Sequence, residues 1–118
     1  MIQTSVTDTE LLEEVIPKLK NIELFLHDTL RVKIDGCRVP KEIHRLRNLK
    51  SEFELEISMI RMNLSHLLRR YSDQLIRTVE DAKRERGTQI VLDEHEAVAI
   101  ERIRRLYQRS QEVQTDPA

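Results

Sequence analysis

Several residue types are scarce in this 118-residue chain, which has no tryptophan, 2 glycines, 3 prolines, 1 cysteine and only 3% aromatic residues. So few glycines leave little room for the tight turns of a β-sandwich or for a glycine-rich phosphate-binding loop. The core must therefore be built from Leu, Ile and Val. Charged residues make up 35% of the chain. This composition predicts an all-α protein and argues against an enzyme that binds a nucleotide.

The single cysteine, Cys37, cannot form an internal disulfide, which fits a reducing compartment. No run of eighteen apolar residues is present, and the N-terminus is polar and acidic rather than signal-like. The net charge of −1 gives no overall attraction to nucleic acid or to a membrane surface. We therefore expect an intracellular protein, cytoplasmic or nuclear, without a membrane partner.

The strongest pattern in the chain is a stripe of apolar residues between Pro40 and Gly87, spaced by three or four positions. This spacing keeps one face of an α-helix apolar over about eleven turns and predicts a single helix that ends near Arg86. A rod of that length must pack against other helices, from its own chain or from a partner. The stripe continues through Val79 and Ala82, and its candidate core or interface residues are Leu46, Leu49, Phe53, Ile57, Ile60, Leu64, Leu67, Tyr71 and Leu75.

A first helix is expected to begin near Thr7, because Thr7 and Glu10 have the spacing of a capping box. Its apolar stripe runs on to Leu30. Pro17 lies inside this stripe, and a proline within a helix removes one hydrogen bond and clashes with the preceding turn. We expect either a kink at Pro17 or a second helix that starts with Pro17 in its first turn.

The remaining boundaries follow from glycine, proline and acidic residues. Gly36 and Pro40 are expected to end one helix and open the next, and Gly87 to end the long helix. An apolar crossing, Thr88–Leu92, leads to a second capping box at Asp93 and Glu96 and a helix to about Gln111. The fold class predicted is a helical bundle built around one long central helix with shorter antiparallel helices. One domain spans residues 1–112, with a flexible tail over 113–118.

Candidate catalytic or metal-binding residues do not form a recognised motif. None of the four histidines, His27, His44, His66 and His95, has the spacing of a zinc site. Glu52, Glu54 and Glu56 alternate within a helix, which places them on different sides and not as an acid–base pair. Cys37 follows Gly36 in a loop and has no dedicated base. We expect a non-enzymatic protein without cofactor, metal or small-molecule substrate.

A local basic segment follows the acidic N-terminal region. Basic side chains of this kind would contact phosphates in a salt-sensitive manner, independent of sequence. The alternative is a solvated face balanced by nearby glutamates, which the near-zero net charge and the few aromatics favour. The candidate nucleic-acid contacts are Lys33, Arg38, Lys41, Arg45 and Arg47.

Three motifs follow one another along the chain: Leu11-Leu12-Glu13-Glu14, then Leu67-Leu68-Arg69-Arg70-Tyr71 in the long helix, then Leu92-Asp93-Glu94-His95-Glu96. Over about residues 8–110 this order resembles the helical A domain of the GINS replication complex. The chain departs from the family at Asp73-Gln74-Leu75-Ile76, where a basic–apolar pair is usual, and by lacking a strand-rich segment after Gln111. The resemblance implies a non-catalytic subunit of a tetramer that links helicase components during DNA replication.

Three functions therefore remain open. The first is a helical scaffold or assembly subunit, of GINS type if the resemblance holds. The second is a self-associating, coiled-coil-like adaptor, in which Leu64→Asp would dissociate a homodimer; in a GINS-like tetramer the same change would unfold the protomer. The third is a helical nucleic-acid-binding module that uses the basic segment.

Overall fold

The computed structural model describes residues 3–80 and 87–115, and the fold over these ranges is all-α, with one small strand pair. The first helical segment contains α1 (Asp8–Glu10), η1 (Leu11–Val15), α2 (Ile16–Leu24), η2 (Phe25–Leu30) and α3 (Arg31–Gly36). After a short connector come α4 (Pro40–Arg70) and α5 (Ser72–Glu80). The chain then forms β2 (Gln89–Val91) and α6 (Glu94–Thr115).

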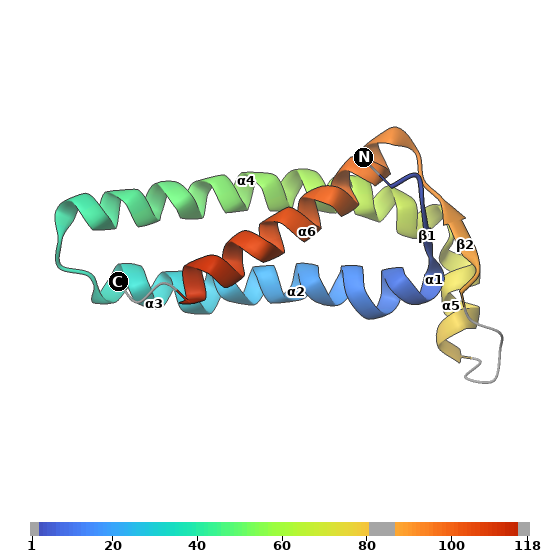
Figure 1. The fold of residues 1–118 in the computed structure, drawn as a ribbon, viewed down its shortest axis with the longest axis horizontal. Helices are drawn as coiled ribbons and strands as arrows, with labels where there is room; N and C mark the ends of the chain where they lie inside the picture. The colour runs from blue at the N-terminus through green and yellow to red at the C-terminus, as the bar shows by residue number, and fades with distance from the viewer. Residues whose placement is uncertain (1–2, 81–86, 116–118) are drawn as a thin grey trace.

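The long helices form an elongated three-helix bundle of 53 × 28 × 23 Å. α4 runs antiparallel to the first helical segment, and α6 crosses the pair diagonally (Figure 1). α4 is the one long helix that the sequence predicted, and it forms one long edge of the bundle in Figure 1. Among the described helices, none has the length and apolar character needed to cross a membrane.

Pro17 does not interrupt the first helical segment. Val15 and Ile16 keep right-handed helical angles, with φ/ψ of −68°/−52° and −64°/−45°. Pro17 lies in the first turn of α2, directly after the π-helical turn η1. A π-helical turn widens the hydrogen-bond pattern before the proline, so the chain passes Pro17 by changing helix type without leaving the helix.

The long helix is shorter than the sequence predicted. α4 ends at Arg70, and Tyr71 leaves the helical region with φ −115° and ψ 20° before α5 begins. The Tyr71 hydroxyl donates to the carbonyl of Val91 and accepts from the amide of Val91, which ties the bend to β2. Val79, expected in the stripe, is 68% exposed.

The end predicted near Arg86, with Ala82, lies outside the described residues. Gly87 has φ +92°, a left-handed conformation that glycine adopts at low cost.

The segment expected as an apolar crossing forms a strand. β1 (Ser5–Thr7) pairs antiparallel with β2, and Val6 lies opposite Ile90 with both side chains buried. The sequence did not indicate this pairing, because each strand is only three residues long and its partner is far away along the chain. The strands close the end of the bundle where α1, α5 and α6 meet.

The helix boundaries at caps agree with the predictions. Thr7 and Glu10 form a reciprocal capping box, and Asp93 and Glu96 do the same at the start of α6. Gly36 ends α3 and Pro40 opens α4. α6 continues to Thr115, beyond the expected end at Gln111, and the side chain of Val113 packs against the core.

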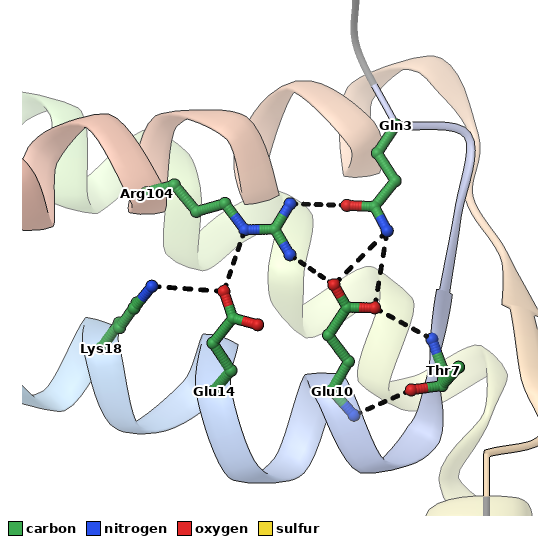
Figure 2. Close-up of polar contacts among 6 residues, drawn as sticks. All are labelled: Gln3, Thr7, Glu10, Glu14, Lys18 and Arg104. Carbon is green, nitrogen blue, oxygen red and sulfur yellow. Dashed lines mark hydrogen bonds and ion pairs between the residues drawn. The ribbon is translucent and has the colours of Figure 1, made fainter.

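Arg104 of α6 joins the last helix to the start of the first segment (Figure 2). Its guanidinium donates to Glu10 at 2.6 Å and to Glu14 at 3.2 Å, and it also contacts Gln3. Burial acts to raise the pKa of Glu14, but the hydrogen bond from Lys18 and the charge of Arg104 outweigh it, so the pKa lies below its usual value. Since Glu10 also completes the Thr7 capping box, one cation stabilises both helix packing and a helix start.

Candidate protein-interaction surface

The predicted apolar stripe of the central helix is the core of the chain itself. Phe53 and Phe25 pack ring against ring, with centroids 5.5 Å apart. Leu49 and Tyr71 are partly buried and pack against this core. The other predicted positions are buried: Leu46, Phe53, Ile57, Ile60, Leu64, Leu67 and Leu75. The described chain therefore covers this face itself, and these side chains are not available to a partner.

The opposite face of α4 carries a second apolar row. Leu55 is 67% exposed, Met59 46% and Met62 68%. Steps of four and three residues place these side chains on one side of the helix. Single exposed apolar residues are common on protein surfaces, whereas an aligned row indicates a contact surface.

Small side chains alternate with this row at a spacing of seven residues. Ser51, Ser58 and Ser65 lie on the same outward face, and all three are exposed. The Ser58 hydroxyl donates to the carbonyl of Glu54 one turn earlier, so its polar group is already satisfied within the helix. We call this surface the α4 outer stripe: Ser51, Leu55, Ser58, Met59, Met62 and Ser65.

Charges border the α4 outer stripe but do not enter it. On the side toward α2, Glu54 pairs with Lys50, and Arg61 pairs with Glu23. On the side toward α6, Glu52 lies 3.4 Å from Arg109. An uncharged centre between charged borders is the usual make-up of a helix seam that receives another helix.

An apolar hollow lies where the first segment meets α5. Its volume is about 440 Å³, and Leu12, Leu68, Leu75, Ile76 and Val79 line it together with Ser72 and Glu80. Ile76 is 53% exposed and Val79 68%. The hollow is distinct from the α4 outer stripe.

One group of potential metal ligands comes together that the sequence did not reveal. Ligand atoms of His66, Asp93 and Glu96 lie within 4.8 Å of one another. Glu96 is only 1% exposed, and its carboxylate accepts from Arg70, from His66 and from the amide of Asp93. These donors, among them the Arg70 guanidinium, satisfy the buried carboxylate of Glu96. The cluster therefore caps the start of α6 and ties it to α4. Sequence spacing could not find it, since His66 and Glu96 are 30 residues apart.

The alternating glutamates of α4 point to different neighbours, as expected. Glu52 pairs with Arg109, Glu54 with Lys50 and Glu56 with Arg102. These contacts hold α4 to α6 or lie along the surface of α4, and they create no acid–base pair. Cys37 is partly buried in the α3–α4 connector, where its thiol lies 3.7 Å from the carbonyl of Val39.

The predicted basic residues gather at the α3–α4 end of the bundle but divide between its two sides. Lys33 and Arg45 line one hollow, and Arg47 lines another with Arg31 and Lys50. Arg38 and Lys41 are exposed near the connector. Acids neutralise part of this charge, because Arg45 pairs with Glu42 and Arg31 with Asp35.

Comparison with known protein families, with curated proteins and with solved structures found no match to this chain.

Proposed function

We propose that the chain is a non-catalytic assembly subunit that binds other protein chains through the α4 outer stripe. The observation that carries the proposal is the exposed row Leu55, Met59 and Met62 on the face of α4 opposite its core. A second helix that covers such a row removes apolar surface from water, which stabilises the contact by about 25 cal/mol per Å² of buried apolar area. The bordering charges give the contact its orientation and partner choice.

Capture of partners by variants of the tagged chain tests the proposal. Leu55→Glu/Met62→Glu places two charges in the stripe and keeps helix-forming residues, so the fold remains. Val32→Glu is the matched control, because Val32 is 70% exposed but lies on α3. We expect the wild-type chain and the control to retain the same associated chains, and the double variant to lose them. Equal retention by the double variant would contradict the proposal.

The more specific form of the proposal is a GINS-type replication subunit. It rests on the order of motifs in the sequence and on the helical layout, with a capped first helix, a long second helix and a capped last helix. Affinity purification from the native host tests it directly. Helicase and replication subunits among the proteins that co-purify would support this form. Their absence, with other partners captured through the stripe, would leave assembly without the GINS role.

Nucleic-acid binding at the α3–α4 end is a second candidate. The observation that favours it is the set of cations there for which no ion pair is found among the described residues, namely Lys33, Arg38, Lys41 and Arg47. Such a surface would bind phosphates with an affinity that falls steeply as salt rises. The experiment is a titration of a labelled oligonucleotide at two salt concentrations.

A further inference from the structure

We infer that the occupant of the α4 outer stripe is a second copy of this chain, packed antiparallel along α4. The inference rests on the proposed function and adds the partner and the register. The first support is the size of the side chains along the stripe. Seven-residue spacing puts Leu55 and Met62 in one column and Ser51, Ser58 and Ser65 in the neighbouring column. In an antiparallel pair the two columns face each other, so each large side chain meets a serine.

The matching of large and small side chains selects the orientation. With Leu55 opposite Ser58 of the second copy, Met62 falls opposite Ser51 and Asn48 opposite Ser65. Each of these layers occurs twice because the pairing is two-fold symmetric. A parallel pair would instead place serine against serine in every other layer and leave voids, which interiors avoid.

Charge selects the register among antiparallel pairings. The same alignment brings Glu54 beside Arg61 of the second copy, and this contact also occurs twice. A shift of one heptad in either direction would place Glu54 beside Glu54 or Arg61 beside Arg61. Like charges across a helix seam are unfavourable, so only one of the three registers pairs opposite charges.

The remaining geometry leaves room for the second copy. From 48 to 65 the outward positions are all exposed, and η2 and α6 pack on the other side of α4. Figure 1 shows α4 as a long edge of the bundle. Glu54 and Arg61 are exposed and have partly exposed intrachain partners, Lys50 and Glu23, and ion pairs at the surface are exchanged at little cost.

Cysteine cross-linking tests the orientation and the register together. In a Cys37→Ser background, Asn48→Cys and Ser65→Cys are prepared as separate proteins and oxidised alone or mixed. We expect the mixture to form a mixed disulfide at least tenfold faster than either protein alone. Lys20→Cys, on the exposed surface of α2, mixed with Asn48→Cys gives the rate of random collision. A mixture that cross-links no faster than this control overturns the inference, and so does faster self-cross-linking of either protein.

Charge reversal gives an independent test that does not depend on cysteine. Glu54→Arg and Arg61→Glu should each weaken self-association at least tenfold, and the double variant should restore it, because the cross-chain pair is only inverted. Loss of association in the double variant, with an unchanged circular dichroism spectrum, contradicts the inference. A chain that is monomeric but still captures other proteins through the stripe would contradict the inference that a second copy binds there. The proposed function would then still hold.

Discussion

Thr78 and Asp8 are 70 residues apart in the sequence, and the Thr78 hydroxyl donates to Asp8 Oδ2 at 2.8 Å. Asp8 is only 1% exposed, and its other oxygen accepts from the amides of Thr9 and Gly87 at 2.7 and 3.1 Å. One carboxylate thereby fastens α5 and Gly87, two residues before β2, to the start of the first helix. This contact explains why α5 turns away from the line of α4 after Tyr71.

Replacing Asp8 should destabilise the fold in a pH-dependent way. Burial acts to raise the pKa of Asp8, but the hydrogen bonds from Thr78, Thr9 and Gly87 outweigh it, so the pKa lies below 3.8. A lowered folded-state pKa contributes stability above the unfolded value and loses it as the pH falls through the folded value.

We expect Asp8→Asn to lower the free energy of unfolding by about 1–3 kcal/mol near neutral pH. The deficit relative to wild type should shrink as the pH falls below the unfolded-state value near 3.8 and through the lower folded-state pKa, because only the wild type loses this contribution. Urea unfolding followed by circular dichroism across that range measures both. A deficit that stays constant with pH would show that the charge of Asp8 is not what stabilises its contacts with Thr78 and Gly87.

Leu64→Asp should unfold the chain, not dissociate an assembly. Leu64 is 5% exposed within the monomer, and a carboxylate there has no partner to offset its burial. The expected loss is about 4 kcal/mol or more, enough to abolish a small domain. Circular dichroism should show lost helicity, whereas Leu55→Asp, on the outward face, should remain helical. A folded Leu64→Asp protein would contradict the core position of Leu64 and favour the alternative that the sequence also allowed, an interface residue.

Arg104→Ala should weaken the packing of α6 on the first segment. The change leaves Glu10 and Glu14 without their shared cation, and we expect a loss of about 1–3 kcal/mol. The matched control is Arg105→Ala, because Arg105 is exposed and its ion pair among the described residues is with Glu101 one turn away. Arg104→Ala should unfold at a clearly lower temperature than Arg105→Ala. Equal unfolding temperatures would mean that the network in Figure 2 contributes nothing measurable.

If the α3–α4 end binds nucleic acid, Arg38→Glu/Lys41→Glu should abolish that binding. Wild-type affinity should fall at least tenfold between about 50 and 200 mM salt. Fluorescence anisotropy with a labelled oligonucleotide measures both effects, with Arg105→Glu as a single charge-reversal control on α6. Absence of binding by the wild type at the lower salt concentration would remove this candidate function.

Local signals in the sequence were sufficient for much of the fold. The caps at Thr7 and Asp93, the glycine and proline between α3 and α4, and the spacing of the core residues all depend on neighbours within one or two turns. The break at Tyr71 depends on Val91, and the bend of α5 on Asp8, and neither contact has a local signature. Periodicity likewise finds an apolar face without saying which elements cover it.

The candidate surface was harder to predict for the same reason. Residues Leu46 to Leu75 gave the stronger apolar signal, and the structure shows that the chain covers this face itself. The α4 outer stripe has only three large apolar residues, interleaved with serines, so its pattern is weak. Its meaning emerges only once the structure shows which face of α4 is left exposed.

Sedimentation equilibrium of the purified chain, compared with Leu55→Glu/Met62→Glu, tests the central claim most directly. The apparent mass of the wild type should rise with concentration from 14.0 kDa toward twice that value. The apparent mass of the double variant should stay at 14.0 kDa, with an unchanged circular dichroism spectrum. The control Val32→Glu should behave as wild type. Association of the double variant equal to that of wild type would contradict the claim that the chain assembles through the α4 outer stripe.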